Sequence, residues 1–148
     1  MATVSPPWAY TLQLPHDPRA PGIARATLRT VLAAHGFTSL TPTAELLASE
    51  LLTNAHLHTQ GPYALRIRSA EPDRLRIAVW DSGSEIPPGF GARGPPGLAP
   101  PAPAPAGPNT AENGRGLHLV RACADRWGAH VLGDVRGGKL LWAECGRG

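Results

Sequence analysis

The sequence predicts an α+β fold, a two-layer sandwich in which helices cover one face of a mostly antiparallel sheet. Short segments of alternating polarity occur in pairs, whereas segments with helical spacing stand apart from them. Glycine or proline separates most of these elements. The chain has 148 residues, 42% of them hydrophobic, which suits a single domain over 1–148 with one buried core.

The first part of the chain predicts one strand followed by two helices. Residues 8–15 (WAYTLQLP) alternate like a strand and end at a proline. Residues 20–37 carry apolar side chains near helical spacing, which predicts the first helix. A second helix is predicted over 41–59, with Thr41 as its N-terminal cap and Pro42 at its first helical position.

The second part predicts two hairpins with a helix between them. Residues 63–70 and 74–81 alternate between apolar residues and arginine, which is typical of an antiparallel hairpin with one buried face. Residues 114–128 (GRGLHLVRACADRWG) have the pattern of a helix that opens on glycines and stops at a glycine. Residues 129–135 and 139–145 predict a closing hairpin.

A long segment rich in proline and glycine precedes the third helix. Residues 86–113 contain nine prolines and five glycines, so neither helix nor strand is expected to persist there. One interpretation is a tolerated low-complexity insertion, and another is a lid over a ligand. Both can hold, if low-complexity sequence fills the position of a lid.

Charge and cysteine content restrict the class of protein. The net charge is +3, and the 14 lysines and arginines are scattered, without a run that would suit nucleic acid. Cys123 and Cys145 form no CxxC pair, so we expect reduced thiols in a cytoplasmic protein. The N-terminus has no signal-peptide pattern, and no apolar run approaches the roughly 20 residues that span a bilayer.

The second helix carries a line of polar residues at four-residue spacing. At about 100° per residue, Glu50, Asn54 and His58 fall within the same sector as Leu47 and Leu51. This sector is predicted to face the interior, where a carboxylate is costly unless it is paired or lines a cavity. A buried hydrogen-bond network and the wall of a ligand pocket explain the line equally well. His56 is predicted to face outward and receives no role.

The residue types in this line favour an oxygen-ligated cation. The spacing of His56 and His58 does not place them on one helix face, and no HExxH or CxxC motif supports zinc. Mg²⁺ is commonly held by one or two protein oxygens together with water and substrate phosphates. Asn54 could supply such an oxygen, and Glu50 could orient or deprotonate a nucleophile.

Two further segments point to a nucleotide. Asp81 ends a predicted buried strand and Gly83 follows in the turn, so the carboxylate could accept hydrogen bonds from an exocyclic amine. An ordinary turn is the alternative. Gly114 and Gly116 flank Arg115 at the start of a predicted helix, where free N–H groups favour an anion. A hinge and cap is the alternative there.

The ordered set of motifs resembles a known family. Glu50 and Asn54 (ExxxN), Asp81 and Gly83 (DxG), a variable lid and 114–117 (GxGL) follow the order of the N, G1 and G2 boxes of the Bergerat fold. That ATP-binding fold is shared by gyrase, histidine kinases and anti-sigma-factor serine kinases. ELLTNAHLHT, GRGLHLVRACADRWG and GGKLLWAE are most similar to short, stand-alone actinobacterial members related to the anti-sigma-factor kinases.

The resemblance implies ATP and Mg²⁺ as cofactors and a role for each matched residue. Asn54 would coordinate Mg²⁺, Glu50 would be the general base, and Asp81 would bind the adenine amino group with Gly83 beside the ring. The phosphates would be contacted by Gly114, Arg115, Gly116 and Leu117. Residues 86–113 would form the ATP lid. His58 matches a histidine of the small members and has no assigned role.

The implied function is that of an ATP-binding regulatory protein. It would transfer the γ-phosphate of ATP to a serine or threonine of a partner protein, such as a sigma factor or its antagonist, and homodimers are compatible with it. No nucleic acid or membrane partner is expected. The alternative is a nucleotide-binding module that sequesters a transcription-regulatory partner without catalysis. Glu85 at the second glycine of DxGxG and the proline-rich lid favour it, and Leu140 stands where the family often has a threonine. A third is an ATPase subunit that works only with a separate partner.

Overall fold

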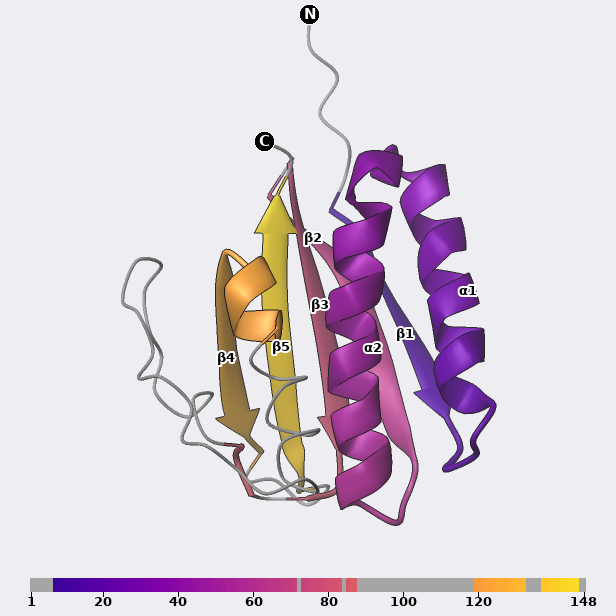
Figure 1. The fold of residues 1–148 in the computed structure, drawn as a ribbon, viewed down its shortest axis with the longest axis vertical. Coiled ribbons are helices and arrows are strands. Elements are labelled where there is room, and N and C mark those ends of the chain that lie inside the picture. The colour runs from indigo at the N-terminus through magenta and orange to yellow at the C-terminus, as the bar shows by residue number, and fades with distance from the viewer. Residues whose placement is uncertain (1–6, 72, 84, 88–118, 133–136, 147–148) are drawn as a thin grey trace, which may run out of the picture.

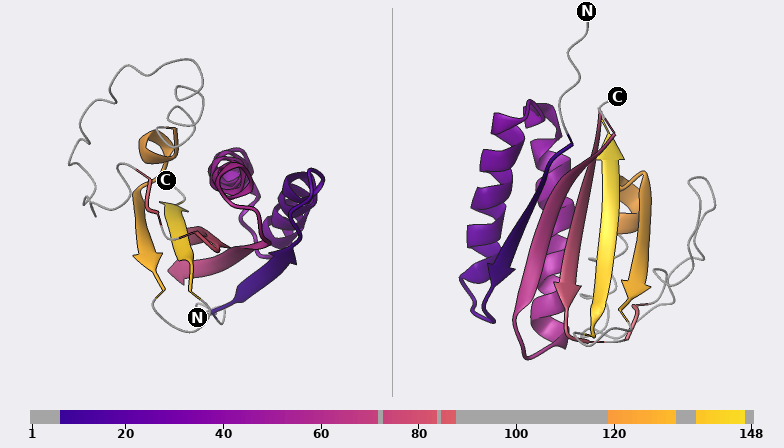
Figure 2. Two further views of the ribbon diagram at one scale, coloured as in Figure 1. Left: turned by 90° about the horizontal axis from the view of Figure 1, so that it is seen from below. Right: turned by 180° about the vertical axis from the view of Figure 1, so that it is seen from behind.

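The fold is an antiparallel sheet with helices packed on one of its faces (Figures 1 and 2). The computed structural model describes residues 7–71, 73–83, 85–87, 119–132 and 137–146. Within these ranges the sheet has five strands, and every neighbouring pair is antiparallel. The predicted α+β, two-layer architecture is therefore confirmed.

The strand order places the last two strands beside the central hairpin. The order across the sheet is β1 (Ala9–Leu14), β2 (Tyr63–Glu71), β3 (Arg74–Asp81), β5 (Lys139–Gly146) and β4 (Arg126–Val131). The closing strand β5 therefore inserts between β3 and β4, and its first residue lies opposite the last residue of β3. Both hairpins predicted from alternation are present in the described residues.

The helices lie on one face of this sheet. Figure 2 shows α1 (Ala20–Ala34), α2 (Thr41–His58) and the short helix of residues 119–123 on the same side. α2 packs mainly on β3 and on α1, so it crosses the middle of the sheet. No helix among the described residues is both long enough and apolar enough to span a membrane.

The buried layer between helices and sheet follows the alternation in the strands. Leu65, Ile67, Ile77, Val79 and Leu141 are almost fully buried on the strand side. Leu47, Leu51 and Leu52 of α2 are fully buried opposite them. Burying one such side chain contributes about 1.5–3 kcal/mol, so this layer fixes the orientation of α2 and of every polar residue on it.

The N-terminus of α2 differs from the sequence prediction. Thr41 is not the cap, because a 3₁₀ turn (Thr38–Leu40) runs directly into the helix and Leu40 takes the cap position. Thr41 already has helical angles (φ −53°, ψ −48°), whereas a capping side chain needs an extended backbone. Pro42 was predicted at the first helical position, but it is the second residue of the helix, which begins at Thr41.

The third predicted helix ends earlier than Gly128, the residue at which the sequence predicted its end. Residues 119–123 are helical, but β4 already begins at Arg126, so the prediction of helix up to Gly128 was wrong. Trp127 is buried and pairs with Ala143 of β5, which extends the hairpin backwards by three residues. The predicted start of this helix, 114–118, lies outside the described residues.

Candidate functional site

Asn54 has a buried oxygen that lacks a hydrogen-bond partner. The residue lies on α2, one turn before the helix ends, and is only 7% exposed. Its Oδ1 atom has no hydrogen-bond partner among the described residues. Leaving such an acceptor unsatisfied costs about 1–3 kcal/mol, and most buried polar atoms in native proteins are bonded. Asn54 Oδ1 is therefore available to a cation or to a donor on a ligand.

Glu50 lies one turn before Asn54 and is half-buried. Burial raises the pKa of its carboxyl group above the ordinary value of 4.5. His58 is exposed, and the neighbouring Leu57 is 56% exposed. The predicted inward line is therefore buried at Asn54, partly buried at Glu50, and open at His58, the last residue of α2.

His56 was predicted to face outward, and that prediction was wrong. Its Nδ1 atom lies 2.9 Å from the hydroxyl oxygen of Tyr63, and its ring stacks on that of His16 with centroids 4.1 Å apart. Tyr63 is fully buried. His56 therefore anchors the end of α2 to the start of β2, and the sequence alone offered no sign of this long-range packing.

Asp81 ends β3 in a buried ion pair. Its Oδ1 atom accepts hydrogen bonds from Lys139 Nζ at 2.7 Å and from the backbone N–H of Gly83 at 2.8 Å. The side chains of Asp81 and Lys139 are only 1% and 3% exposed. The pairing of β3 with β5 places these two residues directly opposite each other.

Lys139 is a site residue that the sequence analysis missed. The signal was present in the alternation of β5, because Lys139 shares the inward face with Leu141 and Ala143. A lysine at the inward end of a buried strand requires an acidic partner.

Gly83 packs tightly against this ion pair. A Cβ atom at this position would lie 3.2 Å from both Asp81 Oδ1 and Lys139 Nζ, and 3.3 Å from Thr59 Cγ2. Thr59 is buried and directly follows α2. The two sequence motifs, one on α2 and one at the end of β3, are thus brought together at the same end of the fold (Figure 1).

Several predicted residues lie outside the described part of the chain. These are the proposed phosphate contacts Gly114, Arg115, Gly116 and Leu117, together with most of the predicted lid. Of that lid, Ile86 and Pro87 are described; they have no regular structure, and Ile86 packs against the core. Glu85, just before them, is exposed.

The side-chain oxygens at this site are of the type that binds Mg²⁺ together with a phosphorylated ligand. Asn54 offers one unsatisfied buried oxygen, and the Glu50 carboxylate is one turn away. The described residues contain no group of three or more His, Cys, Asp or Glu placed to hold a metal. Mg²⁺ does not need such a group, since water and phosphate oxygens complete its octahedron.

Comparison with known families gives one match over most of the chain. Residues 14–142 match the model of the histidine kinase-like ATPase domain. That range contains α2, β3 and the first residues of β5, and with them Asn54, Asp81 and Lys139. Among curated proteins, none matches the chain. The match covers far more than half of the sequence, and the chain belongs to the histidine kinase-like ATPase domain family.

Proposed function

We propose that this domain binds Mg-ATP between α2 and the end of β3 and transfers the γ-phosphate to a serine or threonine of a regulatory protein. Membership of the family supports ATP binding. The observation that carries the proposal is the buried Oδ1 of Asn54, which lacks a partner among the described residues. The partner would be a sigma factor or its antagonist, in the cytoplasm.

Each described residue has a separate task in this proposal. Asn54 would hold Mg²⁺, which when bound would supply positive charge to stabilise the transferring phosphoryl group. Asp81 accepts a hydrogen bond from the adenine amino group through its second oxygen, because Oδ1 already accepts two. Gly83 would lie beside the ring, and its lack of a side chain leaves the Asp81–Lys139 pair undisturbed. Gly114, Arg115, Gly116 and Leu117 contact the phosphates in this proposal.

Glu50 acts as the general base. Its position one turn from Asn54 puts a carboxylate on the metal-binding side of α2. Burial raises its pKa, and a base of higher pKa accepts the proton of a serine or threonine hydroxyl more readily. The partner's hydroxyl oxygen then attacks the γ-phosphate, in line with the leaving oxygen.

The second candidate is a nucleotide-binding module that sequesters its partner without phosphorylating it. In either candidate the adenine would contact the second carboxylate oxygen of Asp81, because Lys139 and Gly83 already donate to Oδ1. The exposed carboxylate of Glu85, close to the same turn, would repel phosphate. The two candidates share ATP binding and differ in phosphotransfer.

We expect Asn54→Ala to weaken Mg-ATP binding by at least about tenfold, because it removes the one protein oxygen proposed to hold the ion. Calorimetric titration with ATP, in Mg²⁺ and in EDTA, measures this loss. Thr53→Ala, at the exposed neighbouring position, is the matched control and should bind like the wild type. Absence of ATP binding by the wild type would overturn the nucleotide proposal.

We expect Glu50→Gln to abolish phosphotransfer without lowering stability at neutral pH. Burial raises the folded-state pKa above 4.5, so ionising Glu50 opposes folding as pH rises through 4.5 to that higher value. Glutamine lacks this cost, so the variant's melting temperature should equal or exceed that of the wild type at pH 7. The difference should disappear below about pH 4.

Transfer of labelled phosphate from ATP to candidate partners completes the test of Glu50. Transfer that survives Glu50→Gln unchanged removes Glu50 as the base. ATP binding without transfer by the wild type favours the sequestering module. A variant that is less stable than the wild type at pH 7 contradicts the stated cause of the pKa shift.

A further inference from the structure

The sheet face that points away from α1 and α2 carries a cluster of arginines. We call it the arginine face; it consists of Arg66, Arg68, Arg74, Arg76 and Arg126. Each of these arginines is next to a buried residue, so its own side chain lies on the opposite face of the strand. Figure 2 shows the helices covering only the other face.

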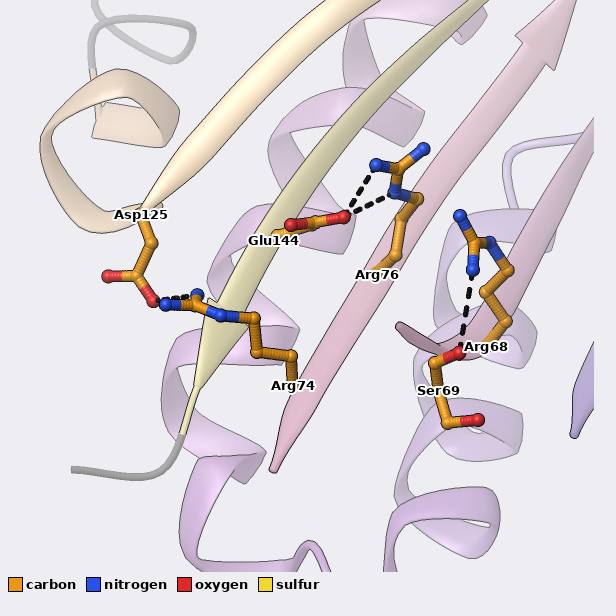
Figure 3. A network of polar contacts seen from close by, with 6 residues as sticks. All are labelled: Arg68, Ser69, Arg74, Arg76, Asp125 and Glu144. Carbon is orange, nitrogen blue, oxygen red and sulfur yellow. Dashed lines mark hydrogen bonds and ion pairs between the residues drawn. The ribbon is translucent and has the colours of Figure 1, made fainter. Parts of the chain in front are cut away.

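Acidic side chains compensate only part of this charge (Figure 3). Arg76 Nε donates to Glu144 Oε2 at 2.7 Å, and Arg74 Nη1 lies 2.8 Å from Asp125 Oδ2. Glu144 lies directly opposite both Arg76 and Arg126 in the pairing of the strands. Arg66, Arg68 and Arg126 form no ion pair with any of the described residues, although Glu144 attracts Arg68 at longer range.

The arginines are held close together by the strands. Arg68 lies directly opposite Arg76 in the pairing of β2 with β3, and Arg66 is two residues along on the same face as Arg68. Alternate residues of one strand are about 6.6–6.8 Å apart. The pKa of Arg68 is lowered by burial and then by repulsion from Arg76 and Arg66, as expected for neighbouring like charges.

Packing also fixes part of this face before any partner binds. The guanidinium carbon of Arg76 lies 4.0 Å from the centroid of the Trp142 ring. The same ring lies against Gly128, where a Cβ atom would come within 2.6 Å of it. Trp142 is therefore packed between Arg76 and β4, and it is half-buried.

We propose that the arginine face docks a carboxylate-rich, extended segment of a partner protein. Guanidinium groups on a strand, two residues apart, match carboxylates two residues apart on an extended peptide. A second copy of this chain would set arginine against arginine. Single-stranded nucleic acid would need freely exposed rings for stacking, whereas Trp142 is half-buried and packs against Arg76 and Gly128.

This docking surface is independent of phosphotransfer. Asp81 and Asn54 lie on the helix side of the sheet, whereas the arginine face lies on the other side. A partner bound there would leave the nucleotide site accessible. The inference therefore holds for a kinase and for a sequestering module alike, and it predicts the chemistry of the partner in both cases.

The test uses a synthetic peptide of alternating glutamate and serine, and a second peptide with glutamine in place of glutamate. Fluorescence anisotropy of the labelled peptides measures binding to the full chain at low and at physiological salt. The variant R66Q/R68Q/R126Q removes the three charges that form no ion pair with a described residue. The matched control R19Q/R25Q/R29Q removes the same charge from α1 and the residue before it, on the helix side.

We expect the acidic peptide to bind the wild type and the α1 control equally. Binding to R66Q/R68Q/R126Q should be about tenfold weaker, since each exposed ion pair contributes modestly. Higher salt should weaken binding, and the glutamine peptide should not bind. Equal loss in both variants would indicate net charge alone and overturn the proposal. So would tighter binding of labelled oligothymidine, or self-association of the wild type that R66Q/R68Q/R126Q abolishes.

Discussion

Lys139→Met is expected to destabilise the fold by about 3–5 kcal/mol, because it leaves the carboxylate of Asp81 buried without its cationic partner. The two side chains are only 3% and 1% exposed, so water cannot replace the lost charge. Among the described residues, the N–H of Gly83 would then be the remaining donor to Oδ1. Unfolding in urea, followed by circular dichroism, measures the change in the free energy of unfolding.

A double-mutant cycle separates the ion pair from other effects of the substitution. Asp81→Asn in the Lys139→Met background removes the unpaired carboxylate, so the double variant should be more stable than Lys139→Met alone. Costs that simply add would show that the two side chains do not interact. Leu140→Met, at the neighbouring half-buried position, is the matched control and should cost little.

The elements of the fold could be predicted from local pattern, because their pattern is strict. Apolar residues alternate with arginine in the middle of 63–70 and at the start of 74–81, and these segments form most of β2 and all of β3. The helical projection placed Asn54 on the inward side of α2, and Asn54 is buried. Local periodicity carries this information wherever one face of an element packs on a single core.

Features that depend on pairing between distant residues could not be predicted in this way. The ion pair of Lys139 with Asp81 requires β5 to lie beside β3, which no local pattern reports. Basic residues that look scattered along the chain are gathered by the sheet, so that Arg126 joins Arg66 and Arg68 on one face. β4 also begins earlier than predicted because of long-range packing. Trp127 is buried in the fold, and strand propensity alone does not predict that burial.

The candidate site was predicted only in part, because local periodicity finds inward positions but does not report contacts between distant residues. Asn54 and Asp81 were found because each is an uncommon residue at an inward position of a regular element. The helical projection treats α2 as covered along its whole length, which fails at its last residue, His58, where the side chain is exposed. The outward position assigned to His56 failed because His16, after β1, packs on that side of the helix.

The second large effect is expected at Gly138, where Ala should destabilise the fold by about 3–5 kcal/mol. Gly138 has φ +87°, a backbone conformation that residues with a side chain rarely adopt. A Cβ atom there would also overlap the backbone oxygen of Asp81 and lie 2.8 Å from Trp80 Nε1. The chain must therefore move at the residue before Lys139, which displaces the ammonium group from Asp81.

Gly137→Ala is the matched control, because it isolates the backbone term. Gly137 also has a positive φ (+70°), but a Cβ atom there would meet nothing within 4 Å. We expect this variant to lose only about 1–2 kcal/mol. Urea unfolding of the two variants gives the difference in free energy, and equal losses would contradict the close approach of Gly138 to Asp81.

The same two variants also connect this packing to the nucleotide site. Gly138→Ala should weaken ATP binding and Gly137→Ala should not, because only Gly138→Ala displaces Lys139 and so changes the orientation of Asp81. Calorimetric titration with ATP measures the difference.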